Sequence, residues 1–179
     1  WVMTEVGENI FAFTHQTFME YFFAKNLEDM YDTTSAILKV LKPRITRREW
    51  DVVAHLALQL KTYRNDRRQE EAIDALIKYI SSSRIKSDRA ALSAFLAAAL
   101  EYLSPNEAAV RRVLEAIAGN ALASGERAKA GSLRDLITAM ASTRDRKDFV
   151  EAQLTRILVL AFQASNEERQ AVVAGLGEE

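Results

Sequence analysis

The sequence predicts an all-α protein, built from antiparallel helical hairpins stacked as a HEAT-like α-solenoid, with a short N-terminal β-hairpin in front. From Thr14 onward, apolar residues recur with the period of an α-helix. The predicted helices are joined by short connections, and two of them are apolar almost all round, as in a stack with a continuous core. A compact helical bundle is the alternative, because short connections are typical of bundles too.

The start of the chain predicts the β-hairpin. Residues 1–6 are rich in strand-forming side chains, Gly7, Glu8 and Asn9 interrupt this run, and residues 10–13 form a second one. An isolated two-stranded hairpin is marginally stable in water. We therefore expect this hairpin to lie against the helices that follow or against another part of the protein.

The first helix is predicted to begin at Thr14, whose hydroxyl can accept a hydrogen bond from an amide of the first turn. Its apolar residues cover more than half of its circumference, so we expect it to be wedged between two partners. These residues are Phe18, Tyr21, Phe22, Phe23 and Leu27.

Two further helices are predicted in the next segment. The first is capped by Thr33 or Thr34 and is closed by Pro43. The second begins at Thr46, and Glu49 stands at the reciprocal position of a capping box. This second helix is one of the two that are apolar almost all round, which predicts that it is buried.

The rest of the chain predicts more amphipathic helices. One covers residues 66–81, Ser87 caps the next over residues 88–103, and Ser104-Pro105 begins another. The predicted caps Thr46 and Ser87 are separated by about 41 residues, near the period of two-helix repeats, which favours the solenoid over the bundle. Further helices are predicted over residues 130–141, 147–164 and 167–176.

Composition excludes several classes of protein. A formal net charge of -1 gives no overall field that would attract nucleic acid or an anionic membrane. The absence of cysteine excludes disulfides and thiolate metal sites and is compatible with a reducing, cytoplasmic location. No apolar run approaches the length of about 18 residues that a membrane helix needs. A start inside a strand without an initiator methionine suggests a fragment of a longer polypeptide.

The hairpin and first helix also carry a motif, aromatic-x-aromatic-x-His-x-Thr-Phe-x-Glu-Tyr-Phe-x-Ala. Its residues are Phe11, Phe13, His15, Thr17, Phe18, Glu20, Tyr21, Phe22 and Ala24. This motif resembles the end of the winged-helix module in NACHT-type STAND NTPases, a superfamily that includes the NOD-like receptors and many bacterial signalling and antiphage proteins. Met19 departs from the family pattern, which usually has glutamine there.

The resemblance implies a domain organisation and a function. Residues 1–31 would be the end of the winged-helix module, and residues 32–179 a helical, HEAT-like domain. The chain would be the C-terminal sensor or scaffold region of a cytoplasmic receptor in antiphage or stress defence, mediating recognition and switching. Its partners would be the upstream NTPase domain of the same chain and a protein ligand or a second copy. The alternative is a stand-alone helical-repeat adaptor for protein–protein interactions.

The resemblance also implies a role for His15, which in the family reaches the β-phosphate of bound ADP. An imidazole can donate a hydrogen bond to a phosphate oxygen. The other interpretation is that His15 ends the strand and packs locally. The chain has no Gly-x-x-x-x-Gly-Lys-Ser/Thr loop. We therefore expect no catalysis and no cofactor in this fragment, with ATP, ADP and magnesium belonging to the intact parent.

The aromatic residues of the motif are expected to mediate interdomain packing, locking the winged-helix end onto the helices that follow. They are Phe11, Phe13, Phe18, Tyr21 and Phe22. Truncating a buried phenylalanine typically costs about 3–5 kcal/mol. Glu20 is expected to pair with a basic group or with backbone rather than to act in acid–base chemistry.

A second group of residues is basic. Lys42, Arg44, Arg47 and Arg48 cluster around Pro43 and form a possible patch for phosphate or an acidic partner. Acidic residues interleave with this cluster, so a solvated face is the favoured interpretation and binding of nucleic acid is not expected.

His55 stands alone in the apolar helix, with no histidine or carboxylate at i+3 or i+4. We expect a core or groove histidine there rather than a metal ligand.

Overall fold

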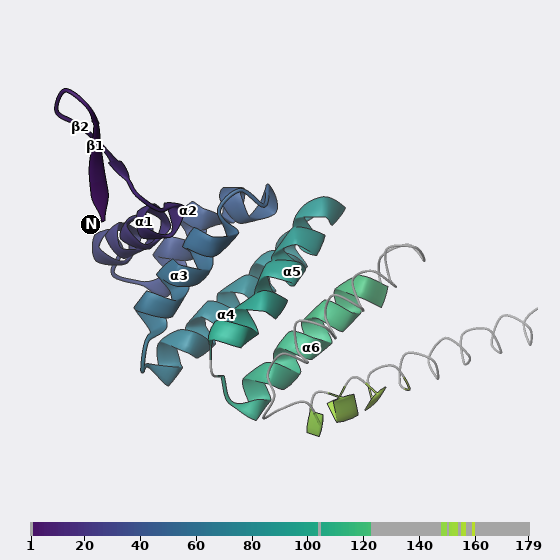
Figure 1. Ribbon diagram of the computed structural model, residues 1–179. Coiled ribbons are helices and arrows are strands. Elements are labelled where there is room, and N and C mark those ends of the chain that lie inside the picture. Colours follow the sequence, from purple (N-terminus) through teal and green to yellow (C-terminus); the bar gives the residue numbers. More distant parts are fainter. Residues whose placement is uncertain are drawn as a thin grey trace, which may run out of the picture.

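The computed structural model describes residues 2–103 and 105–122, together with residues 148–149, 151–153, 155–156 and 159. Within these ranges, an N-terminal β-hairpin precedes a series of α-helices (Figure 1). The predicted all-α fold with a short N-terminal hairpin is confirmed.

Strands β1 (Met3–Gly7) and β2 (Ile10–Phe13) form the hairpin, which is an antiparallel two-stranded sheet. The register pairs Met3 with Phe13, and the ladder is irregular between Glu5 and Gly7. Asn9 in the turn has a φ of 59°, a left-handed conformation that asparagine tolerates better than most residues. The hairpin stands away from the stacked helices at one end of the molecule (Figure 1).

The helices of the described chain pack in two layers. Helices two apart in the chain lie side by side, α1 with α3, α2 with α4 and α4 with α6, and α2 also packs across the layers against α3 and α5. This pattern of contacts is typical of a helical stack, in which each element packs against its near neighbours in the chain. The helices are α1 (Gln16–Met30), α2 (Thr34–Thr46), α3 (Asp51–Thr62), α4 (Asp66–Ser82), α5 (Lys86–Tyr102) and α6 (Glu107–Leu122).

A single hydrophobic core runs through these helices. Ala24 and Leu27 of α1 belong to the same cluster as the buried residues of the other helices, so α1 is packed on the helical body. The domain boundary after residue 31 stays a prediction. The largest fully buried side chains of the described part are Ile37, Leu38, Leu41, Ile45, Leu58, Ile73, Leu76, Leu92, Leu96 and Leu114.

Several predicted helix starts are wrong. Thr14 belongs to the hairpin, where its amide and hydroxyl both donate to the carbonyl of Val2, and His15 is the N-cap of α1. Ser87 lies inside the first turn of α5, whose N-cap is Ile85. The predicted cap at Thr33 is confirmed, because its hydroxyl accepts from the amide of Ala36 at 3.2 Å.

The predictions around Pro43 are also wrong, because α2 continues through this proline to Thr46. Ile45 beyond the proline is almost fully buried, and its packing keeps the last turn helical. Thr46 therefore ends α2, and its hydroxyl donates to the carbonyl of Pro43 at 3.2 Å. Glu49 makes no capping box; it pairs with Arg44, and Trp50 is the N-cap of α3.

The observed helix starts also remove the repeat spacing expected between Thr46 and Ser87, because neither residue caps a helix. Asn106 caps α6 through a 2.8 Å hydrogen bond from the amide of Ala109, so that helix begins after Pro105. The predicted helices over residues 130–141 and 167–176 lie outside the described residues. So does most of the helix predicted over residues 147–164, whose described residues are helical.

Candidate interaction surface

Exposed aromatic side chains gather on the hairpin and on the adjoining part of α1. Phe11 is 57% exposed and Phe22 is 47% exposed, and Phe18 and Tyr21 are exposed beside them. The ring of Phe13 stacks on Phe22 at 5.8 Å between centroids, which joins the hairpin to the helix. We call these five residues the aromatic surface.

The aromatic surface does not face the helical body. The predicted locking contact with the following helices is made instead by Ala24 and Leu27, which are buried against the core. Soluble proteins rarely leave a large contiguous apolar area open to water without a partner for it. A role of the aromatic surface in packing against another domain stays a prediction.

His15 lies where the hairpin joins α1. It is exposed, its backbone is extended as expected of an N-cap, and its side chain makes no capping hydrogen bond. Its ring is 6.0 Å from the ring of Phe18, so the imidazole borders the aromatic surface. Glu20 accepts a hydrogen bond from the Gln16 amide at 2.7 Å and makes no contact with His15 that would form an acid–base pair.

A groove of about 590 Å³ opens between α1 and the start of α3, and we call it the α1–α3 groove. One ring contact joins its two sides: Phe23 of α1 meets Trp50, the N-cap of α3, edge-to-face at 4.9 Å between centroids. Arg44 covers the Trp50 ring at 4.6 Å and pairs with Glu49 at 2.6 Å, which holds the indole in place. The lining residues are Gln16, Met19, Glu20, Phe23, Arg48, Glu49, Trp50, Asp51, Val52 and Val53.

The predicted basic patch has local partners. Arg44 and Arg47 both approach Glu49, at 2.6 and 4.0 Å, and Lys42 lies 4.8 Å from the centre of the Tyr79 ring. Arg48, with a φ of 55°, lines the α1–α3 groove. These contacts agree with a solvated, internally paired face, and binding of phosphate or of an acidic partner there stays a prediction.

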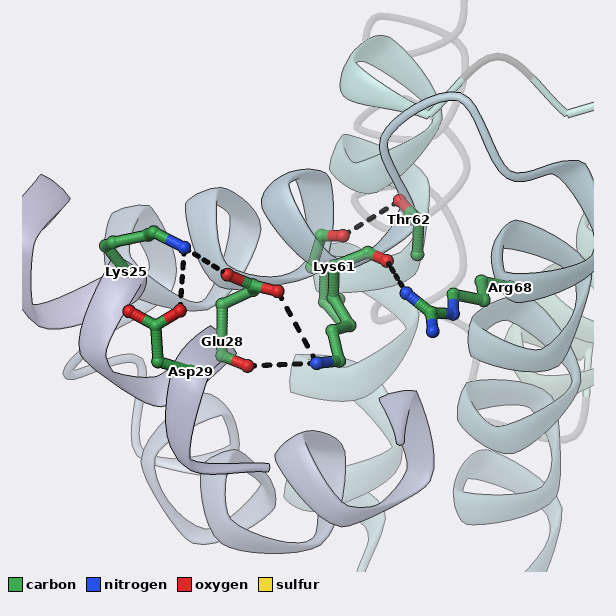
Figure 2. A network of polar contacts seen from close by, with 7 residues as sticks. Lys25, Glu28, Asp29, Lys61, Thr62 and Arg68 are labelled. Atoms are coloured by element: carbon green, nitrogen blue, oxygen red, sulfur yellow. Dashed lines mark hydrogen bonds and ion pairs between the residues drawn. The ribbon is translucent and has the colours of Figure 1, made fainter. Parts of the chain in front are cut away.

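A polar network fastens the end of α1 to α3, and Figure 2 shows it from close by. The Lys61 side chain is only 8% exposed, and its Nζ donates to the carbonyl of Glu28 at 2.9 Å and lies 3.5 Å from a Glu28 carboxylate oxygen. Carbonyls in the last turn of a helix lack partners within the helix. Lys61 of α3 therefore caps the C-terminal end of α1.

The same network extends to both sides (Figure 2). Lys25 pairs with Glu28 at 2.6 Å and with Asp29 at 2.7 Å, and the hydrogen bonds to Asp29 and Glu28 raise the pKa of Lys25 above its usual value. The Arg68 guanidinium of α4 donates to the carbonyl of Lys61 at 3.4 Å. Sequence reasoning missed this network; its one signal was a lysine at the end of an apolar helix.

His55 is half-buried in α3 and packs against α5. Its ring stacks on Phe95 at 4.1 Å between centroids, and its Nε2 lies 3.2 Å from the Phe95 carbonyl oxygen. Burial lowers the pKa of His55 below its usual value, because desolvation disfavours the charged ring, although Asp51 and Glu101 act in the other direction.

Comparisons with protein-family models, with curated proteins and with solved structures found no match. Within the described residues, no group of three or more histidine, cysteine, aspartate or glutamate side chains is placed to hold a metal ion. None of the described helices is long and apolar enough to span a bilayer. The described features that bear on function are the aromatic surface, the α1–α3 groove and the network that joins α1 to α3.

Proposed function

We propose that this chain is the non-catalytic C-terminal sensor or scaffold region of a NACHT-type STAND signalling NTPase. It would recognise a protein ligand and take part in conformational switching, in cytoplasmic antiphage or stress defence. The single observation that carries the proposal is the aromatic surface, because four aromatic side chains of the motif, Phe11, Phe18, Tyr21 and Phe22, are exposed where a neighbouring domain could cover them.

The upstream NTPase domain of the same chain is the proposed partner of the aromatic surface. Burying a large apolar side chain contributes about 1.5–3 kcal/mol, so covering several aromatic rings would hold the two domains together. His15 borders this surface, and its exposed imidazole fits a donor to a phosphate oxygen of ADP. One imidazole makes no phosphate cradle, so the other phosphate contacts and the magnesium site would belong to the parent.

The coupling of α1 to α3 supports the switching part of the proposal. Lys61 joins the end of α1 to α3, and Arg68 continues the connection to α4. A rigid-body movement of the winged-helix end would therefore be passed to the helical body rather than absorbed at α1.

The decisive test is the parent reading frame. A Gly-x-x-x-x-Gly-Lys-Ser/Thr motif upstream of residue 1 supports the receptor, whereas a start codon immediately before it contradicts the proposal and favours the stand-alone adaptor. In the intact parent, His15→Ala should weaken ADP binding by about tenfold, since a hydrogen bond to a charged group is lost. Gln16→Ala, at the next exposed position, is the matched control, and equal ADP affinity in both variants contradicts the role of His15.

A further inference from the structure

The α1–α3 groove lies on the side of α1 that the aromatic surface leaves free. Gln16, Met19, Glu20 and Phe23 are spaced i, i+3, i+4 and i+7, so they form one stripe along the helix. Each helical residue turns the chain by about 100°, which places Tyr21 of the aromatic surface nearly opposite Phe23. Phe22 of the aromatic surface adjoins Met19 at i+3, so a domain docked on that surface would border the groove at Met19 and leave the side of Phe23 open.

The groove has the size and the lining of a binding site. Its volume of about 590 Å³ falls within the range of about 300–1,000 Å³ typical of ligand sites. Met19 of α1 and Val52 of α3 are each about half exposed, and the rings of Phe23 and Trp50 meet edge-to-face. Unbranched methionine adapts to different apolar partners, and tryptophan is enriched among the residues that dominate binding energy at interfaces.

The charges around the groove favour a basic partner. Glu20 contacts the neutral amide of Gln16 and no cation, and within the described chain Asp51 has no ion pair. Glu49 is already paired with Arg44. Arg48 is the one cationic side chain among the lining residues. Glu20 and Asp51, which have no ion pair with the described residues, disfavour an anionic ligand and attract lysine or arginine.

The geometry points to the α1–α3 groove as the docking site for a segment of a partner protein that carries bulky apolar side chains next to lysine or arginine. The apolar side chains would fill the space between Met19, Val52 and Trp50, and the basic ones would pair with Glu20 and Asp51. The inference rests on the proposed function only in its expectation that the chain recognises a protein, and it names the site and the chemistry of that recognition.

Trp50 makes the groove directly observable. The chain has two tryptophans, and Trp1→Phe leaves Trp50 as the only one. The probe is an acetylated and amidated peptide of about twelve residues built from leucine and lysine. Its leucines are spaced three and four residues apart, so that they lie on one face of a helix. Two matched peptides replace every lysine by glutamate or every leucine by alanine, and Trp50 emission is titrated with each.

We expect a saturable change in Trp50 emission with the leucine–lysine peptide and affinities lower by at least about tenfold for both matched peptides. Val52→Lys should lower the affinity for the first peptide by about tenfold or more, because it fills the groove and adds a positive charge. Val40→Lys is the control, since Val40 is exposed on α2 and does not line the groove. Circular dichroism of both variants checks that the fold is retained.

Any of three peptide-binding results would overturn the inference: no saturable binding of the leucine–lysine peptide, equal or better binding of the leucine–glutamate peptide, or equal binding by the Val52→Lys and Val40→Lys variants. A Trp50 signal that depends on protein concentration without peptide would assign the groove to a second copy of the chain and would also overturn it. None of these outcomes depends on the reading frame upstream, so the inference and the proposed function can fail separately.

Discussion

Replacing Lys61 by methionine tests whether α1 is capped by a side chain from α3. The ammonium group is almost buried, and it donates to the carbonyl of Glu28 at 2.9 Å. Methionine keeps most of the packed aliphatic length of lysine but cannot donate. The variant therefore removes the cap and leaves the packing nearly unchanged.

The expected loss follows from the contacts. A hydrogen bond between a charged donor and a carbonyl contributes about 1.5–3 kcal/mol, and a cation at the end of a helix adds a dipole interaction that can reach about 2 kcal/mol in a partly buried site. Methionine carries no charge, so the variant avoids the cost of desolvating the buried ammonium group, which offsets part of the lost stability. We expect Lys61→Met to lower the free energy of unfolding by about 2 kcal/mol.

Urea unfolding followed by far-ultraviolet circular dichroism measures this change. For a chain of this length, a loss of about 2 kcal/mol lowers the midpoint of thermal unfolding by about 4–8 °C. Lys39→Met is the matched control, because Lys39 is exposed on α2, and its effect should stay within about 0.5 kcal/mol. If both variants unfold at the same urea concentration, Lys61 does not act as the cap of α1.

Three further predictions concern the helical body. The folded pKa of His55 lies below its unfolded value of about 6.5, so unfolding takes up a proton below that pH. The stability of the wild type should therefore fall between about pH 7 and pH 5 by more than that of His55→Gln. Urea midpoints that change in parallel for the two proteins would contradict this. Asn65→Ala should cost about 1 kcal/mol in urea unfolding, whereas Ser87→Ala should cost little, because only Asn65 accepts from a first-turn amide. Leu92→Ala should cost about 2–5 kcal/mol by calorimetry, since Leu92 is fully buried; a loss under 1 kcal/mol would contradict the described core.

Helical periodicity was sufficient to predict the fold class and most helices. The α4 helix begins at Asp66, as the pattern indicates, because its apolar stripe and the cap at Asn65 agree. The predicted starts at Thr14 and Thr46 failed for a different reason. Both are good capping residues in isolation, but Thr14 hydrogen-bonds to Val2 across the hairpin and Thr46 lies in the last turn of α2. Local signals cannot show which of two neighbouring elements uses a residue.

The candidate sites were predictable only where they are local in sequence. The aromatic surface lies within one short segment, so the motif names its residues. The α1–α3 groove needs Phe23 and Trp50 to meet, and this contact exists only because α1 packs against α3. The cap by Lys61 likewise joins residues 33 positions apart. The one signal near Lys61, its place at the end of an apolar helix, does not name Glu28 as the partner.

Stacked helical arrays are stable in solution when the helices at their two ends turn a polar face outward. Helix α1 is at one end of the described stack, and its outward face carries Phe18, Tyr21 and Phe22 instead. This end of the stack therefore lacks the polar face of a capping repeat. The protein should become more soluble when these three rings are replaced by glutamine or lysine, as a designed terminal repeat would have them. These substitutions should leave the packing of the core unchanged, because Ala24 and Leu27 on the inner side of the same helix close it.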